Sequence, residues 1–235
     1  MAGDDRGPRL RGHGRDPSGV LSRAGGGERA GGAMRVRLDA AERREELLRA
    51  TVAQIEARGA AAVRVADVAA ALGVSGALVL YHFSTKEKLV AAAFAYAMEG
   101  DLAELGRILD RRAPAARRLR AAVRWYLPSG RSQGCRLWIE CWAAALRERP
   151  VREVAVRLDR RWRSALAEVF AQGAAAGEFR CPDPQGAAGR LATLLNGLGV
   201  RMTVCPGTLS RATVLRWADE ALQRELGGAG EGGGA

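Results

Sequence analysis

The segment between Arg64 and Lys86 contains the residues whose types and spacing suggest a chemical role most clearly. A tight Gly73-Val74-Ser75 turn divides it into two short helices, because Gly73 can adopt the left-handed conformation that ends a helix and Ser75 can cap the next one. Two short helices at this spacing are typical of a helix-turn-helix, whose second helix fits the DNA major groove. The pattern therefore predicts recognition of nucleic acid.

The outward face of the second helix carries small, apolar and aromatic residues. Gly76 and Ala77 are small enough to let the helix backbone approach the base pairs, and Leu78 can contact a thymine methyl group. Tyr81 and His82 can donate hydrogen bonds to phosphates or to base edges. Plainer roles stay open for both, in which Tyr81 packs against the first helix of the chain with its hydroxyl exposed, and His82 is an ordinary solvated residue.

Basic residues lie at both ends of the motif. Lys86 falls in the first turn of the following helix, where its charge adds to the positive helix end and attracts a phosphate. Arg64 precedes the first helix of the motif, and we expect it to contact the DNA backbone. The predicted DNA-binding residues are Arg64, Ser75, Gly76, Ala77, Leu78, Tyr81, His82 and Lys86.

An apolar core must hold this motif in place. A preceding helix carries Leu47, Thr51 and Ile55 at four-residue intervals and stops at Gly59. These three residues form one stripe on the helix surface, against which the motif is expected to pack. The motif residues with the right spacing for this packing are Val68, Leu72, Val74, Val79 and Phe83.

Helical patterns continue through the rest of the chain. We expect Asp39 to cap the first helix and Ser84-Thr85-Lys86-Glu87 to act as a capping box for a long helix. Amphipathic helices follow Pro114 and Pro150, and two more complete the chain. Because no strand-like alternation competes with them, we predict an all-α protein of about nine helices, the first three of which form a helix-turn-helix domain.

The composition narrows the function further. A formal net charge of +11 over 235 residues favours polyanionic partners, either nucleic acid or an anionic membrane surface. We see no apolar run of about eighteen residues and no secretory signal, so we expect a cytoplasmic protein without membrane contact. The sequence contains only two histidines, His13 and His82, and no HExxH, nucleophile-elbow or phosphate-binding glycine motif. These features argue against an enzyme.

The cysteines and the N-terminal segment carry weaker signals. Cys135, Cys141, Cys181 and Cys205 lack metal-type spacing, so we expect free thiols, buried or partly buried, with a redox switch as the alternative. No metal or cofactor is expected. Residues 1–36 are rich in Gly, Arg, Pro and Ser, which predicts a disordered basic tail. Its arginines either contact DNA phosphates or have no role, and Met34 is an alternative start of translation.

The segment from about Glu42 to Ala97 resembles the DNA-binding domain of the tetracycline-repressor (TetR) family of transcription regulators. The matching elements are Val68-Ala69, Gly73-Val74-Ser75, Tyr81-His82-Phe83 and Lys86-Glu87-Lys88-Leu89. The resemblance implies an all-helical homodimer whose variable C-terminal domain binds a small ligand. From Trp138 onward the chain is similar to the subgroup that includes the choline-pathway regulators.

Two positions depart from the family pattern. Val63 and Leu80 stand where the family usually has Thr and Tyr, whose hydroxyls contact the phosphate backbone. We therefore expect Arg64 and Tyr81 to contribute more of the backbone contacts in this chain.

Aromatic residues in the second half predict a ligand pocket. Trp138 and Trp142 are one helical turn apart and share a face, so they can line a cavity between helices. Such a cavity suits an apolar or a cationic ligand. The alternative is that these rings only fill the core. The predicted pocket residues are Trp125, Tyr126, Trp138, Trp142 and Trp162.

The last two helices carry apolar or small faces, which the resemblance implies pair with their copies in a four-helix bundle. The predicted interface residues are Leu194, Gly197, Leu198, Leu215 and Leu222. A two-fold dimer presents its recognition helices about 34–36 Å apart, or a multiple of that distance, to a palindromic operator. The predicted domains are a tail over 1–36, a DNA-binding domain over 37–97, an effector-binding and dimerisation domain over 98–226, and a flexible tail over 227–235.

The sequence thus predicts a sequence-specific DNA-binding transcriptional regulator, most simply a repressor released by a small ligand. The resemblance implies that the ligand shifts the fourth helix like a pendulum and changes the spacing of the two DNA-binding domains. Two alternatives stay open: an activator or ligand-independent regulator of the same fold, and a basic protein that binds nucleic acid without sequence preference.

Overall fold

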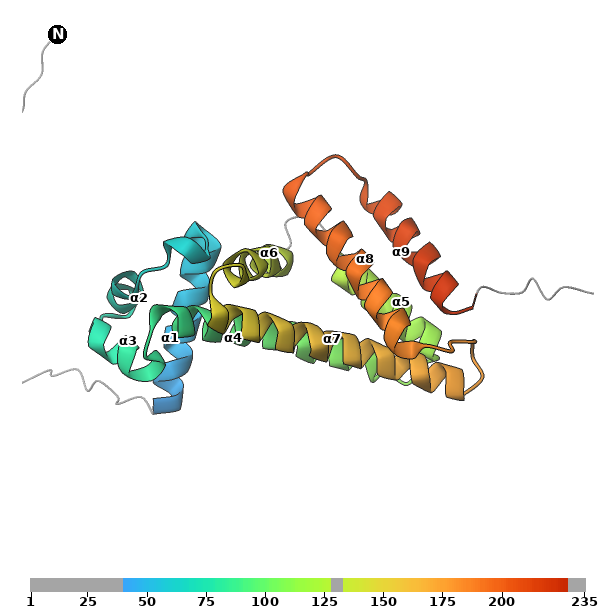
Figure 1. Ribbon diagram of the computed structural model, residues 1–235, viewed down its shortest axis with the longest axis horizontal. Coiled ribbons are helices and arrows are strands. Elements are labelled where there is room, and N and C mark those ends of the chain that lie inside the picture. Colours follow the sequence, from blue (N-terminus) through green and yellow to red (C-terminus); the bar gives the residue numbers. More distant parts are fainter. Residues whose placement is uncertain (1–39, 128–132, 228–235) are drawn as a thin grey trace, which may run out of the picture. The chain divides into compact units, whose positions relative to one another are not determined.

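Helices make up most of the chain that the structure describes (Figure 1). The computed structural model describes residues 40–127 and 133–227, and within these ranges it contains nine α helices, one short 3-10 turn and no strand. The all-helical prediction is confirmed. The predicted cap at Asp39 and the predicted tails over 1–36 and 227–235 lie outside the described residues, apart from Gly227.

The first three helices form the headpiece, together with a short 3-10 turn between the first and the second. Gly59 ends the first helix with a φ of 83°, and Gly73 ends the second with a φ of 62°. The Ser75 hydroxyl oxygen accepts a hydrogen bond from the Leu78 amide at 3.2 Å, which confirms the predicted cap. The elements are α1 (Ala40–Arg58), η1 (Ala60–Ala62), α2 (Val65–Leu72) and α3 (Gly76–Phe83).

The core of the headpiece follows the predicted stripe. Thr51, which is fully buried, satisfies its hydroxyl by donating to the Leu47 carbonyl oxygen at 2.7 Å. The Arg44 guanidinium lies 5.0 Å from the centre of the Phe83 ring, a distance that allows a cation–π contact between α1 and α3. Of the five motif residues predicted to pack here, Val68, Val79 and Phe83 are buried, and Leu72 and Val74 are partly buried.

Six longer helices follow the headpiece. They are α4 (Lys86–Leu109), α5 (Ala115–Tyr126), α6 (Gln133–Ala145), α7 (Arg149–Ala175), α8 (Pro184–Val204) and α9 (Arg211–Glu225). The capping box expected from Ser84 and Glu87 at the start of α4 does not form, because Ser84 adopts a φ of 65° and ends α3. Thr85 is therefore the cap, and its hydroxyl oxygen accepts a hydrogen bond from the Lys88 amide.

Two apolar cores hold these helices together. One lies among α4, α5, α7, α8 and α9, where Leu119, Phe170 and Leu191 are almost fully buried. The other begins in the headpiece and continues into α6 and the first half of α7, so that Trp138 and Cys141 share it with the α1 stripe. The headpiece therefore has no separate core of its own.

Two further findings concern membranes and thiols. Within the described ranges, no single helix is long and apolar enough to cross a membrane, although α2 and α3 together are, across a bend of 113°.

All four cysteines are free thiols. Cys205 is exposed, unlike the burial expected for it, whereas burial raises the pKa of the Cys141 thiol to about 12.

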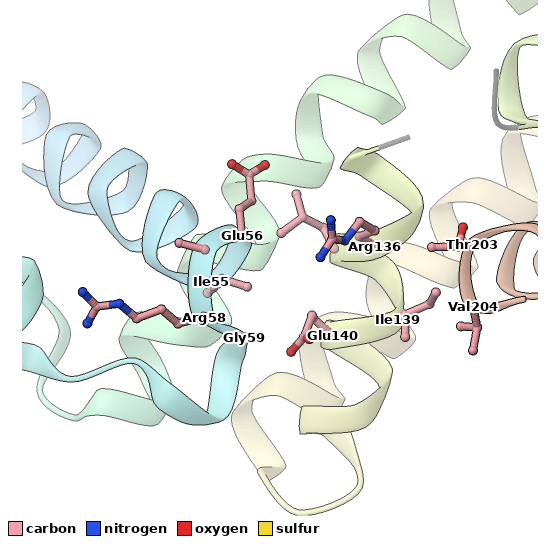
Figure 2. Close-up of a pocket in the computed structure, with 11 residues that line it drawn as sticks. Ile55, Glu56, Arg58, Gly59, Arg136, Ile139, Glu140, Thr203 and Val204 are labelled. Atoms are coloured by element: carbon pink, nitrogen blue, oxygen red, sulfur yellow. The ribbon is translucent and has the colours of Figure 1, made fainter. Parts of the chain in front are cut away.

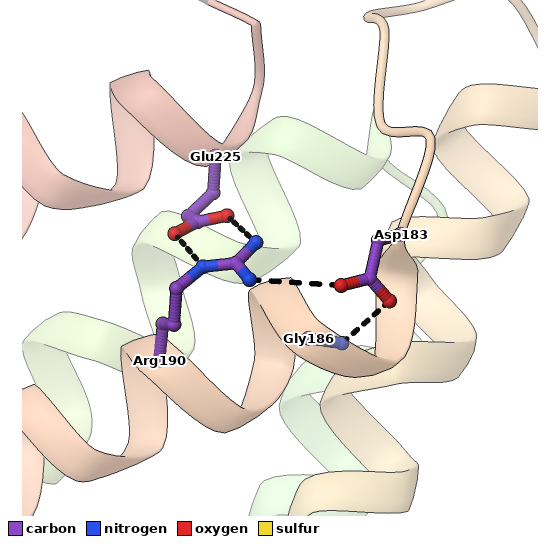
Figure 3. Close-up of polar contacts among 4 residues, drawn as sticks. All are labelled: Asp183, Gly186, Arg190 and Glu225. Atoms are coloured by element: carbon purple, nitrogen blue, oxygen red, sulfur yellow. Dashed lines mark hydrogen bonds and ion pairs between the residues drawn. The ribbon is translucent and has the colours of Figure 1, made fainter.

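A polar network joins the beginning of α8 to the end of α9 (Figure 3). The Arg190 guanidinium donates two hydrogen bonds to the Glu225 carboxylate, at 2.8 and 2.7 Å. It also lies 3.6 Å from Asp183, whose other oxygen caps α8 by accepting from the Gly186 amide. A bidentate pair of this kind restricts the orientation of the two side chains as well as their separation. It therefore helps to set the packing of α8 against α9 at this end.

We expect Arg190→Met to lower the melting temperature by a few degrees at low salt, because the two-pronged pair between α8 and α9 is lost. Thermal unfolding followed by circular dichroism measures the change. Arg216→Met, which removes an exposed arginine of α9, is the matched control. The difference from wild type should shrink in high salt, since exposed ion pairs are screened. Equal melting temperatures at low salt would contradict the role given to Arg190.

Candidate DNA-binding face and ligand cavity

The outward face of α3 is open to solvent. Tyr81 is 83% exposed and Leu80 is 42% exposed, which is unusual for large apolar and aromatic side chains on a packed helix. The Tyr81 and His82 rings meet edge to face, with their centres 5.5 Å apart. At this exposure Tyr81 does not pack against the first helix, α1, and its hydroxyl is open to a partner outside the subunit.

The small residues at the start of α3 have no packing reason to be small. A Cβ atom on Gly76 would meet only a Val65 methyl carbon at 3.8 Å, an ordinary contact. Ala77 is exposed, and Leu78 and His82 are partly buried. The surface around the first turn of α3 is thus low and accessible, as close approach to a groove floor requires.

The two predicted basic contact residues, Arg64 and Lys86, have different environments in the structure. Arg64 is exposed and occupies the cap position of α2, where its side chain makes no capping hydrogen bond. Lys86 is partly buried and donates a hydrogen bond to the Ala61 carbonyl oxygen at 3.2 Å. An ammonium group carries three donors, so this contact leaves Lys86 able to reach a phosphate as well.

The two positions that depart from the family pattern have distinct environments. Val63 is 2% exposed and belongs to the headpiece core, so its side chain packs where a hydroxyl group would need a partner. Leu80 lies on the exposed side of α3 beside Tyr81 and offers an apolar surface instead of a hydroxyl.

Two adjoining cavities lie among helices α4 to α8. The larger, about 160 Å³, is lined by Asp101, Trp125, Tyr126, Gly134, Cys135 and Trp138. The smaller, about 10 Å³, is lined by Tyr126, Trp138, Trp142, Asp159, Trp162 and Asn196. All five predicted aromatic pocket residues line one or both cavities. A space of about 150 Å³ is enough for a benzene-sized molecule.

The aromatic rings also pack on one another, so they contribute to the core as well. Trp162 stacks on Trp125 with ring centres 5.8 Å apart, and Tyr126 meets Trp162 edge to face at 5.2 Å. The Tyr126 hydroxyl donates a hydrogen bond to the Asn196 side-chain oxygen at 2.5 Å. This packing fixes the orientation of the rings that line the cavity.

A carboxylate gives the cavity a negative end. Burial raises the pKa of Asp101, and among the described residues no hydrogen bond or ion pair engages its carboxylate. Asp159, by contrast, pairs with Arg163 at 2.9 Å. Burial also raises the pKa of Tyr126 and of Cys135, so both stay neutral near pH 7. Aromatic faces with one carboxylate form a site that attracts an organic cation.

Sequence reasoning did not identify Asp101, Asp159, Cys135 or Asn196 as cavity residues. A signal for Asp101 is present in the sequence. It lies three residues after Met98 and four before Leu105, both of which are almost fully buried. A carboxylate on the apolar stripe of a helix marks a candidate functional group.

The predicted dimer residues fall into two groups. Leu198 and Leu222 are buried within the subunit, at 6% and 0% exposure, and cannot reach another molecule. Leu194 and Leu215 are partly buried, and Gly197 is exposed with nothing within 4 Å of the position a Cβ atom would take. Two apolar residues that sequence reasoning did not single out, Val204 and Trp217, are exposed on α8 and α9.

The two halves of the chain each match a known family. Residues 47–93 match the model of bacterial regulatory proteins of the tetR family, and residues 115–227 match that of the C-terminal part of BetI-type transcriptional repressors. The transcriptional regulator BetI of Stenotrophomonas maltophilia is 32% identical over 194 residues, which cover 77% of this chain and 93% of that protein. BetI of Ectopseudomonas mendocina is 28% identical, covering 78% and 93%.

Solved structures give the same result. A TetR-family regulator from Rhodococcus sp. matches with a TM-score of 0.67 and 29% identity, covering 79% of this chain and 99% of that one. A transcriptional regulator from Saccharomonospora viridis, solved in complex with choline, matches with a TM-score of 0.65 and 25% identity, covering 78% and 95%.

We expect Arg64→Ser to separate the capping role of this position in α2 from its role in contacting DNA phosphate. A serine at the cap of α2 should raise the free energy of unfolding by about 1 kcal/mol, because it accepts a hydrogen bond that arginine cannot. The same change should weaken binding to all duplexes alike and reduce the salt dependence by about one ion, if Arg64 contacts a phosphate. Chemical unfolding and fluorescence anisotropy at several salt concentrations measure the two effects.

Arg111→Ser is the control, since it removes the same charge from an exposed turn after α4. It should leave both quantities near their wild-type values. An unchanged salt dependence in the Arg64 variant would remove that residue from the phosphate contacts.

Proposed function

Since the chain belongs to the TetR family of transcriptional regulators, we propose that it is a repressor that binds a palindromic operator as a homodimer and is released by a small organic cation. Members of this family regulate transcription and are not enzymes. The observation that carries the proposal is the aromatic cavity with Asp101 at one end, which shares α6 with the headpiece core. We place this repressor in the cytoplasm, where a bacterial operator is found.

The exposed face of α3 supports the DNA-binding role of the predicted residues. Tyr81 is 83% exposed, and the small residues Gly76 and Ala77 give the backbone room to approach base edges. Arg64 and Lys86 lie at neighbouring helix starts, where cations and helix amides attract the same phosphates. The proposed division is base contact by Leu78 and Tyr81, and backbone contact by Arg64, Ser75, His82 and Lys86.

The open faces of α8 and α9 support the dimer. Gly197 lets a second helix approach closely, and Leu194 and Leu215 lie partly uncovered nearby. Val204 and Trp217 add exposed apolar surface on the same two helices, and a homodimer interface is the simplest cover for it. The interface we propose therefore uses these five residues, while Leu198 and Leu222 support it from inside the subunit.

The charge and size of the cavity support a small cationic ligand. A quaternary ammonium group fits against the faces of Trp125, Tyr126 and Trp138, and the Asp101 carboxylate balances its charge. The related regulator from Saccharomonospora viridis was solved with choline. We therefore propose a choline-like cation as the effector, which disfavours the DNA-bound state by binding it less tightly than the released state.

A selection of bound genomic fragments tests the proposed function. We expect a palindromic site that binds two subunits, with operator affinity lowered by choline. Tyr81→Ala should cost about 1–3 kcal/mol on the selected operator and less on random DNA, since only the operator offers the base it reads. Leu146→Ala is the control, because Leu146 is 75% exposed on the turn after α6. Equal affinity for operator and random duplexes would favour a sequence-independent binder instead.

Asp101→Asn should weaken choline binding about tenfold or more, or roughly 1.4 kcal/mol, because the cation loses its buried counter-charge. Quenching of tryptophan fluorescence measures the affinity. A neutral carbon isostere of choline should bind wild type and variant alike, since it has the shape without the charge. Asp110→Asn, at the exposed end of α4, is the control. Unchanged choline affinity in the Asp101 variant would contradict the assignment.

The same interaction predicts a pH dependence. Burial raises the pKa of Asp101, so the carboxylate takes up a proton at a higher pH than an ordinary aspartate. Choline affinity should therefore fall as the pH drops through this raised pKa, and recover above it. The dependence should be absent in Asp101→Asn. A flat profile in wild type would show that the carboxylate does not face the cation.

A further inference from the structure

Helix α6 contacts the ligand cavity and the headpiece at the same time. Gly134, Cys135 and Trp138 line the larger cavity. Leu137 and Cys141, which lie next to them along the helix, are buried in the core that contains α1. A displacement of α6 caused by an occupant of the cavity is therefore felt directly by the headpiece.

One polar contact joins the same helix to the corner between α1 and α2. The Ala60 amide, the first of η1, donates a hydrogen bond to the Glu140 carboxylate at 2.9 Å. Figure 2 shows Glu140 on α6 beside Gly59 at the end of α1. A Cβ atom on Gly59 would lie 3.3 Å from the carboxylate, so the glycine allows both the positive φ and this close approach.

The surroundings of Glu140 are hollow. A cleft of about 450 Å³ lies on one side, between the end of α1, α6 and the end of α8 (Figure 2). A second space of about 140 Å³ lies on the other side, beside Lys86 and Ala144, and Glu140 lines both. Open space therefore lies on two sides of this corner, and the Ala60–Glu140 hydrogen bond crosses between them.

The Ala60–Glu140 bond is suited to being either made or broken. Ala60 is 4% exposed, so its amide depends on the Glu140 carboxylate for its hydrogen bond while the two are in contact. A hydrogen bond that is 2.9 Å long is largely lost when the atoms separate by about an ångström. Small helix shifts of about 1–2 Å are a common form of regulatory movement.

We propose that Glu140 is a coupling residue, which transmits the occupancy of the aromatic cavity to the headpiece through the Ala60 amide. The proposal rests on the proposed function, because it needs a ligand beside Trp138. From Ala60 the chain passes through buried Val63 to Arg64 and the start of α2, so release of η1 changes how the helix-turn-helix is held. Glu140 contacts neither ligand nor DNA and acts by positioning.

The test compares how strongly choline lowers operator affinity in wild type and in Glu140→Ala. The variant should bind choline within about twofold of wild type, while the effect of choline on operator affinity should shrink about fivefold or more. Hydrogen exchange of the Ala60 amide should speed up when choline binds to wild type. In the variant it should already be fast without ligand.

Two controls isolate the hydrogen bond from the loss of charge. Glu140→Gln keeps an accepting oxygen and should retain the wild-type coupling. Glu56→Ala removes an exposed carboxylate from the same cleft and should also behave as wild type. A Glu140→Ala protein that keeps the full choline effect would overturn the proposal while leaving the proposed function intact.

A second trigger separates failure of this proposal from failure of the proposed ligand. If choline does not quench the tryptophan fluorescence of wild type, the proposed ligand class is wrong. The coupling can then be tested without a ligand, because Cys135→Phe places a large side chain from α6 in the cavity. That change should lower operator affinity in the wild-type background and much less in the Glu140→Ala background. Equal losses in the two backgrounds would overturn the coupling role.

Discussion

The shared apolar core of the headpiece, α6 and α7 is the constraint on which the rest of the structure depends. Trp138 and Cys141 are 7% and 0% exposed, and they pack in one cluster with Leu47 and Ile55 of α1. Protein interiors are close-packed, so a side chain cannot move without displacing its neighbours. Because Trp138 also lines the aromatic cavity, packing links the cavity to the headpiece.

Local chemistry was predictable from the sequence, because it depends on residues a few positions apart. Gly73 and Ser75 specify the turn between α2 and α3 through one positive φ and one hydrogen bond to Leu78. The cap of α4 lies one residue later than predicted, because Ser84 adopts a positive φ in the turn before it. Such a φ is usual for glycine, so the serine gave no sign of it in the sequence. The proposed DNA-binding residues followed from this local pattern, and all of them are exposed or partly exposed on the headpiece.

Contacts between distant positions were not predictable in the same way. Periodicity shows that α8 and α9 have apolar faces, but it does not show which apolar residues their own subunit covers. Leu198 and Leu222 are buried inside the subunit, whereas Trp217 and Val204 are exposed. The contact between Ala60 and Glu140 joins residues 80 positions apart and depends on the close approach that Gly59 allows. A single sequence does not show that Gly59 and Glu140 lie close together.

The cavity also illustrates a conflict between stability and regulation. A space of about 160 Å³ beside a carboxylate with a raised pKa makes the empty protein less stable than a filled apolar core would. A larger side chain in place of Cys135 or Gly134 would recover packing, yet it would leave no differential binding energy with which to shift the headpiece. An effector that offsets the desolvation of Asp101 stabilises whichever arrangement of α6 accommodates it. The strength of any such regulation is bounded by the difference in the effector's affinity for the two states of the protein.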